Sequence, residues 1–188
     1  MLGRLAWGGA VGPVAFVTAW AVGGATTQRP YSAVETTISR LAAIGADTRP
    51  LMTAGFVVFG LAVLAHALAL RRAVPGSAWV TAVVTGVATL AVAALPLDRS
   101  SAVDGAHGIA AGVGYVSLAL TPVLAARPLL RLGERWMALG GLGLAAVSTV
   151  ALPVSLAVSE TGLFQRLGLG AVDLWLVASV PVVRRLLR

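Results

Sequence analysis

The sequence predicts a single-domain, all-α integral membrane protein with six transmembrane helices. Hydrophobic residues make up 58% of the 188 residues and charged residues 11%, whereas a water-soluble domain carries roughly 25% charged residues. Long uncharged stretches recur along the chain, and about 20 apolar residues suffice for a helix to cross a bilayer. An open sheet would leave backbone groups unpaired in lipid, so each stretch is expected to be helical.

Six stretches between charged residues have the required length. The predicted transmembrane helices cover about residues 5–25, 51–71, 77–97, 106–126, 136–158 and 164–183. The first is longer than the 7–15-residue apolar region of a signal peptide, so we count it as a transmembrane helix. Gly8 and Gly12 in the first helix, and Gly108 and Gly112 in the fourth, have the G-x-x-x-G spacing that suits close helix packing.

The arginines predict how the helices are oriented in the membrane. All 14 basic residues are arginines, and nine of them lie on the side that holds both termini. Positively charged residues are enriched in the cytoplasmic connections of membrane proteins. We therefore expect a multi-pass protein of the cell membrane with both termini in the cytoplasm. The net charge of +7 is not gathered into a basic patch with interleaved aromatic residues, so no nucleic-acid partner is expected.

The first outer connection has the pattern of a short amphipathic helix over about residues 32–45. Ser32 and Glu35 form the S-x-x-E capping box that begins helices, and Gly45 is a plausible stop. On a helical wheel one face carries Val34, Ile38, Leu41 and Ala42, and the opposite face carries Glu35, Thr36, Ser39 and Arg40. Such a helix would lie at the outer interface, either as a spacer packed against headgroups or as a lid over a cavity.

Several residues carry a resemblance to a known family. These are Tyr31–Ser32, Thr37–Leu41 and Gly45 in the first outer connection, and His107–Gly108 at the entry to the fourth span. Together with six spans they resemble a family of small prokaryotic membrane proteins catalogued as domain of unknown function nine-nine-eight. The resemblance implies the six-helix fold and supplies no catalytic residues.

The second outer connection places Asp98, Arg99, Asp104 and His107 within ten residues. Asp104 and His107 are three residues apart and share a face if the fourth helix begins there. Three interpretations stay open: a helix N-terminus capped by Asp104, a divalent-metal site, and an acid–base pair in which the carboxylate orients the imidazole. The D-x-x-H pattern is too short to define a metal site, so no metal is predicted.

Asp173 is the acidic residue expected deepest in the membrane. It follows Phe164, where the sixth helix is expected to begin, by about 13 Å of helix. An acid at that depth is costly and should face the bundle interior with a partner or a function. Arg166 lies two turns earlier on the same face, which would make a groove from the outer surface to the acid. The structural alternative is an acid that joins two helices through Ser148, Thr149 or Thr121.

No cofactor is predicted. The chain contains no cysteine, which excludes thiolate catalysis and iron–sulfur clusters. His66 and His107 are expected near opposite membrane faces, where they could not ligate one haem, and His66 is interpreted as a packing histidine. No glycine-rich phosphate loop or hydrolase signature occurs.

The functional hypothesis is a polar pocket open to the outer face that binds a lipid- or isoprenoid-like molecule. Asp173 would be the acid and His107 the base, with Asp104 beside it. The substrate-binding residues would be Glu35, Arg40, Asp98, Glu160 and Arg166. Membrane lipids and an amphipathic small molecule are the expected partners, and whether the ligand is transformed by proton transfer stays open.

Two alternatives to this hypothesis remain. The first is a small proton-coupled transporter or permease subunit with Asp173 as the proton carrier, which at this size would be a homo-oligomer. The second is an accessory membrane protein without a ligand, whose polar residues only cap helices.

Overall fold

The computed structural model describes residues 2–188, which are all-helical apart from their connections. The elements are α1 (Leu2–Leu5), α2 (Gly8–Thr26), the 3₁₀ helix η1 (Ile38–Ala42), α3 (Arg49–Ala73), α4 (Ala78–Ala94), α5 (Ser101–Arg131), α6 (Arg135–Val154) and α7 (Thr161–Leu186). No strand occurs among the described residues. The predicted all-α class is confirmed.

Five helical segments are long and apolar enough to cross a membrane. They are Leu2–Thr26, which joins α1 and α2, and the helices α3, α5, α6 and α7. Helix α4 has 17 residues, about 25 Å, and is shorter than the predicted span over 77–97. It ends at Ala94 because Leu95 precedes Pro96, and the residue before a proline disfavours the helical conformation.

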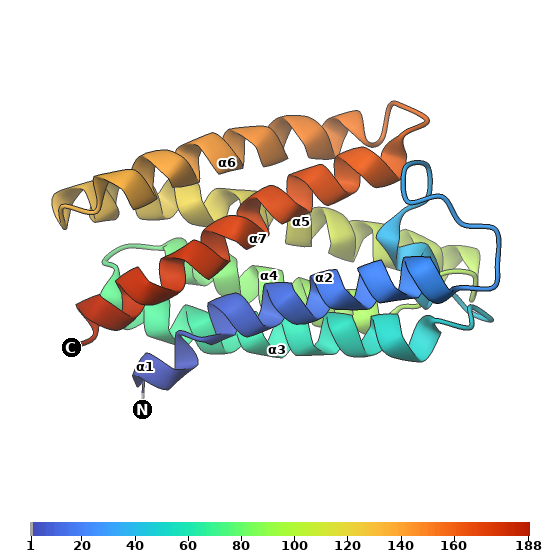
Figure 1. Ribbon diagram of the computed structural model, residues 1–188, viewed down its shortest axis with the longest axis horizontal. Coiled ribbons are helices and arrows are strands. Elements are labelled where there is room, and N and C mark those ends of the chain that lie inside the picture. Colours follow the sequence, from blue (N-terminus) through green and yellow to red (C-terminus); the bar gives the residue numbers. More distant parts are fainter. Residues whose placement is uncertain (1) are drawn as a thin grey trace.

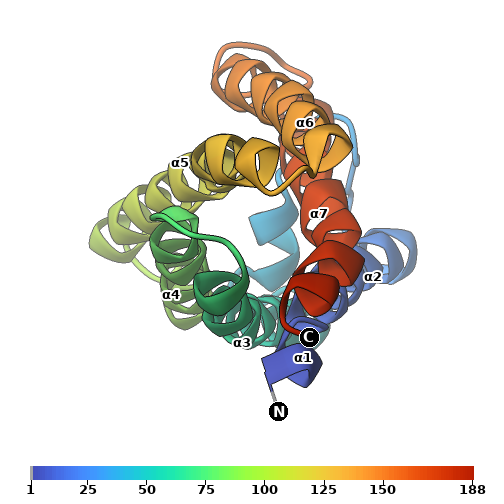
Figure 2. The same cartoon turned by 90° about the vertical axis from the view of Figure 1, so that its left-hand side faces the viewer.

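The six long helices form a ring in which sequence neighbours pack side by side. Figure 2 shows α2 to α7 following one another around the ring, with α7 returning to pack against α2. Both termini lie at one end of the bundle, called here the terminal end (Figure 1). The connections α2–α3, α4–α5 and α6–α7 lie together at the opposite end, called the η1 end.

Close packing at the terminal end depends on glycine. A Cβ atom on Gly8 would lie 2.0 Å from the carbonyl oxygen of Ala62, and one on Gly12 would lie 3.3 Å from the Ala62 Cβ. The first G-x-x-x-G pattern therefore marks the contact of α2 with α3. The second does not mark a contact, because a Cβ on Gly108 or Gly112 would meet no atom within 4 Å.

The predicted extent of the amphipathic helix, residues 32–45, is wrong. Only Ile38–Ala42 are helical, and they form a 3₁₀ helix. Ser32 begins a single turn, in which its Oγ accepts from the Glu35 N–H at 3.2 Å and its carbonyl accepts from the Thr36 N–H at 2.7 Å. The backbone is then extended at Thr37, with ψ 151°. The apolar face is nevertheless buried at Ile38, Leu41 and Ala42, whereas Val34 is 45% exposed.

Candidate functional site

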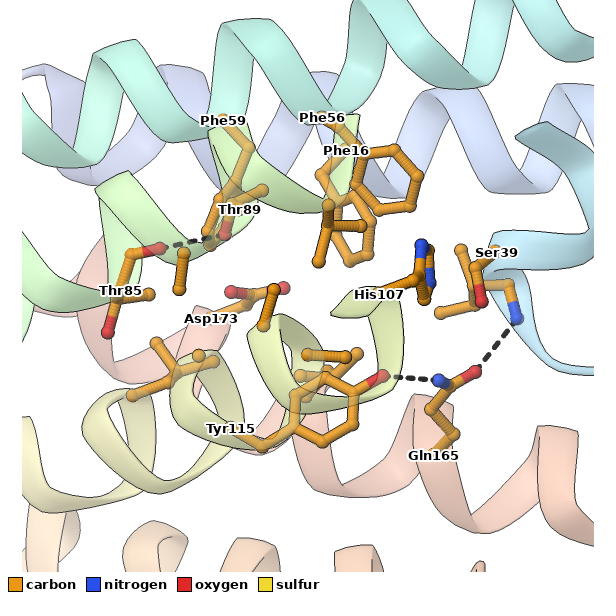
Figure 3. Close-up of a pocket in the computed structure, with 18 residues that line it drawn as sticks. Phe16, Ser39, Phe56, Phe59, Thr85, Thr89, His107, Tyr115, Gln165 and Asp173 are labelled. Atoms are coloured by element: carbon orange, nitrogen blue, oxygen red, sulfur yellow. Dashed lines mark hydrogen bonds between the residues drawn. The ribbon is translucent and has the colours of Figure 1, made fainter. Parts of the chain in front are cut away.

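A cavity lies inside the ring of helices, next to η1 (Figure 3). About 50 Å³ is open to the centre of a water-sized sphere, and one water needs roughly 10–15 Å³ of such space. Most of the wall is apolar and includes Phe16, Phe56 and Phe59. The ring centroid of Phe16 lies 5.7 Å from that of Phe56 and 5.4 Å from that of Phe59. The polar lining residues are Ser39, Thr85, Thr89, His107, Tyr115, Gln165 and Asp173.

Asp173 of α7 lines this cavity and has no hydrogen-bond partner in the described part of the chain. The residue is 4% exposed, and its Oδ1 is fully buried without a bond among residues 2–188. Asp173 does not join two helices through Ser148, Thr149 or Thr121. Among residues 2–188, the Ser148 hydroxyl has no hydrogen-bond partner, Thr149 donates to the Ala145 carbonyl, and Thr121 lies within hydrogen-bond distance of the Thr81 hydroxyl and the Ser117 carbonyl. A buried polar group without a partner is costly, so the bonding capacity of Asp173 is available to a ligand.

His107 of α5 faces the same cavity with one ring nitrogen engaged. Its Nδ1 lies 2.7 Å from the carbonyl oxygen of Leu95. A carbonyl can only accept, so Nδ1 carries the hydrogen and donates, and in the neutral ring Nε2 keeps its lone pair. Nε2 makes no hydrogen bond among residues 2–188, so it can accept a proton or a hydrogen bond from a ligand.

The predicted pairing of Asp104 with His107 does not form. Asp104 Oδ1 instead accepts from the backbone N–H of Asp98 at 3.0 Å, across a turn in which Asp98 has φ 63°. The helix is capped by Ser100, whose Oγ accepts from the Val103 N–H at 3.3 Å. Asp104 therefore stabilises the α4–α5 connection and lies outside the cavity.

Two residues of the cavity wall, Gln165 and Tyr115, were not predicted. The backbone N–H of Ile38 donates to Gln165 Oε1 at 2.8 Å, which leaves Gln165 Nε2 to donate to the Tyr115 hydroxyl. Gln165 and Asp173 are eight residues apart with Leu169 between them, and all three line the cavity. An amide at this spacing from an acid in an apolar helix was the signal that could have identified Gln165.

Arg166 does not extend the cavity towards the surface, as its spacing from Asp173 had suggested. Its Nη1 donates to the carbonyls of Ala33 at 2.8 Å and Thr36 at 3.1 Å, and its Nη2 donates to the Tyr31 hydroxyl. Burial raises the pKa of Tyr31 above its ordinary value, although the neighbouring guanidinium acts in the opposite direction. Arg166 therefore attaches the first connection to α7.

The remaining predicted residues lie outside the cavity. Arg40 and Asp98 form an ion pair at 2.7 Å with each side chain about half exposed. Glu35 and Glu160 are exposed, and their carboxylates make no hydrogen bond or ion pair among residues 2–188. Among residues 2–188, no group of three or more His, Asp or Glu side chains is placed so that it could hold a metal ion.

Of the eight predicted site residues, two, Asp173 and His107, line this cavity. Comparison with known proteins then bears on the whole chain. A family model described as "Protein of unknown function (DUF998)" matches residues 10–180. No curated protein and no solved structure matches the sequence. The match covers most of the six-helix bundle and agrees with the resemblance carried by the connection between α2 and α3, so the chain belongs to the DUF998 family.

Proposed function

We propose that this protein binds an amphipathic small molecule inside the membrane and exchanges a proton with it. The observation that carries the proposal is the carboxyl group of Asp173, buried without a partner on the wall of a cavity. Acidic residues inside membrane helices are costly and by default mark a substrate, ion or proton site. An apolar cavity with a few convergent polar groups is also the usual form of a small-molecule site.

Two ionisable groups of the cavity wall, Asp173 and His107, have complementary roles in this proposal. Asp173 is the acid, and the Nε2 lone pair of His107 is the base. Proton transfer by positioned side chains of this kind accelerates reactions roughly 10²–10⁴-fold. The ligand could therefore be protonated at one atom and deprotonated at another without access to bulk water.

The size of the cavity restricts the ligand. A space of about 50 Å³ accommodates a group of a few non-hydrogen atoms. A lipid- or isoprenoid-like molecule would therefore place its polar or reactive end beside Asp173, and its remaining chain would lie between helices. The phenylalanines of α2 and α3 provide an apolar wall for the part nearest this end.

The proposed orientation places the cavity towards the outer side of the cell membrane. Nine of the 14 arginines belong to the terminal end and its connections, and cytoplasmic segments are the ones enriched in arginine. The η1 end would then face outwards, and the turn Ile38–Ser39 would lie between the cavity and the outer surface. We propose that η1 acts as a lid.

Proton-coupled transport is the second candidate, favoured by a row of hydroxyl groups between α4 and α5. Thr85, which lines the cavity, lies 2.9 Å from Ser117 through their hydroxyl oxygens. Nearer the terminal end, Thr121 donates to Thr81 at 3.0 Å. These two hydroxyl pairs, Thr85 with Ser117 and Thr121 with Thr81, lie between the cavity and the terminal end, and the proposed path for protons from Asp173 follows them.

The test is to identify molecules that co-purify with the protein in native-lipid particles. Mass spectrometry would compare the wild type with Asp173→Asn and His107→Ala, and with Glu160→Gln as a control at an exposed position outside the cavity. We expect one small molecule to be enriched at least tenfold in the wild type and in Glu160→Gln, and to be lost from the two cavity variants. Identical lipid profiles in all four samples would sink the proposal.

A second assay separates the two candidates. The wild type and Asp173→Asn would be reconstituted in vesicles that contain a pH-sensitive dye, and the identified molecule would be added outside. Conversion of the molecule without a change in internal pH supports acid–base catalysis. Uptake of the unchanged molecule with internal acidification that is lost in Asp173→Asn supports proton-coupled transport.

A further inference from the structure

A second cavity lies at the η1 end and shares no lining residue with the cavity around Asp173. It is larger, with about 230 Å³ open to the centre of a water-sized sphere. Its wall consists of the first connection, the turn before α3 and Asp98. η1 lies between the two cavities, because Ile38 and Ser39 line the first whereas Arg40 and Leu41 line the second.

Arg29 gives this outer cavity an unpaired positive charge. Its guanidinium makes no hydrogen bond or ion pair among residues 2–188, although the residue lines the cavity. One guanidinium nitrogen lies 2.9 Å from the position a Cβ would have on Gly45, whose φ is 77°. Because Gly45 has no side chain, the Arg29 guanidinium can occupy this space.

Arg40 contributes a second guanidinium whose donors are only partly used. Its Nη1 donates to both carboxylate oxygens of Asp98, at 2.7 and 2.9 Å, while Nη2 and Nε make no bond in the described chain. Arg29 and Arg40 with the single carboxylate of Asp98 give the lining a net charge of +1. The Tyr31 hydroxyl accepts from Arg166, so its own hydrogen is free to donate.

We propose that the outer cavity binds a phosphate-type oxyanion between Arg29 and Arg40. Arginine presents several donors in a plane that matches phosphate oxygens, and such charge-assisted hydrogen bonds are stronger than neutral ones. The bound group is either the phosphate of a lipid headgroup or free phosphate, because both present the same oxygens. This site is independent of the function proposed for the Asp173 cavity.

The test uses the full chain, depleted of lipid in a non-ionic detergent. Inorganic phosphate is titrated at constant ionic strength, and the midpoint of thermal unfolding is measured for the wild type, Arg29→Gln and Arg99→Gln. Arg99 is an exposed arginine of the same end that does not line the cavity, so it is the matched control. Since the Arg29 guanidinium makes no hydrogen bond among residues 2–188, its replacement removes none and the variant should fold. In a parallel experiment each protein is placed in lipid discs of phosphatidylcholine with phosphatidylglycerol, and retained lipid is identified by native mass spectrometry.

The outcomes distinguish the two sources of the anion. If phosphate is the ligand, the midpoint rises with phosphate in the wild type and Arg99→Gln, and Arg29→Gln needs about tenfold more phosphate for half the effect. If a headgroup is the ligand, phosphatidylglycerol is retained by the wild type and Arg99→Gln, lost from Arg29→Gln, and inorganic phosphate has no effect. The proposal is overturned if neither probe binds, or if Arg29→Gln and Arg99→Gln behave alike.

Discussion

The two histidines are both buried, yet their surroundings differ. His66 of α3 is 0% exposed, and both its ring nitrogens have partners: Nδ1 donates to Ala6 at 2.9 Å, and Nε2 lies 3.1 Å from the Ser179 hydroxyl. His107 is 5% exposed, has a partner for Nδ1 alone, and lines a cavity. Burial by itself therefore does not distinguish a packing residue from a site residue. Unused bonding capacity beside free space does.

The same contrast divides the bundle along its length. At the terminal end helices approach closely through glycine, and a Cβ on Gly9 would lie 2.7 Å from the His66 ring. Near η1 the helices enclose a cavity, and Asp173 has no partner there among the described residues. Close packing stabilises the terminal end, whereas the region near η1 contains Asp173, a polar group whose burial without a hydrogen bond costs free energy.

The largest expected effect comes from filling a contact at the terminal end. Gly8→Ala places a methyl group on the Ala62 carbonyl and should lower the free energy of unfolding by about 3 kcal/mol, since backbone must move. Gly108→Ala is the control, because its methyl group meets only open space and alanine favours the helix by about 0.5–1 kcal/mol. Thermal unfolding in detergent measures the stability of both variants. Equal losses of stability would contradict the conclusion that close packing at the terminal end depends on glycine.

The two histidines provide a second comparison. His66→Ala should lower the free energy of unfolding by about 2–3 kcal/mol, because it removes the hydrogen bonds of both ring nitrogens and opens a hole in a packed region. His107→Ala should cost about 1 kcal/mol, since one hydrogen bond is lost beside space that already exists. Chemical unfolding measures the free energy of unfolding of both variants. A larger loss of stability in His107→Ala than in His66→Ala would contradict the interpretation of His66 as the packing residue.

Two buried acids should respond with opposite sign. Asp173→Leu is expected to raise the free energy of unfolding by about 1–2 kcal/mol, because it removes an unpartnered polar group and fills part of the cavity. Glu134→Leu is expected to lower it by about 0.5–1 kcal/mol, since it breaks the ion pair with the solvent-exposed Arg185. Thermal unfolding of the two variants provides the measurement. A loss of stability in Asp173→Leu would mean that the acid contributes to packing.

The smallest expected effect concerns a surface acid and pH. Hydrogen bonds from the Gln28 N–H and the Thr27 hydroxyl lower the pKa of Asp47 below its usual value of 3.8. The stabilisation is therefore complete above pH 3.8 and is lost as the pH falls through the lower folded value. The unfolding midpoint of Asp47→Asn should lie below that of the wild type near neutral pH, and the gap should close on acidification. Glu35→Gln, at an exposed acid without partners, should show no such change.

The sequence predicted the helices well because their cause is local. Uncharged stretches of sufficient length must be helical in lipid, and each predicted span contains a helix. The first connection was predicted less well because its backbone groups bond across the fold: the Ile38 N–H goes to Gln165, and the Val34 carbonyl accepts from the Leu163 N–H at 2.8 Å. A helix over 32–45 would leave those partners unsatisfied.

The candidate site shows the same limit. Asp173 could be placed in the interior because a carboxylate facing lipid is too costly. His107 was selected for a pairing with Asp104 that does not form, and the Leu95 carbonyl which orients it could not be known from spacing. Gln165 was not predicted, because its partners, Ile38 and Tyr115, lie far from it in the sequence.

If η1 acts as the proposed lid, Gln165 would limit the rate at which the proposed ligand enters. Its side chain links η1 to α5 by accepting from Ile38 and donating to Tyr115. Displacing η1 would leave a buried backbone N–H unpaired, at a cost of about 1–3 kcal/mol, which would make the open form roughly 5- to 150-fold rarer than the closed one. Association should then reach a ceiling as ligand concentration rises, set by how often η1 opens rather than by diffusion.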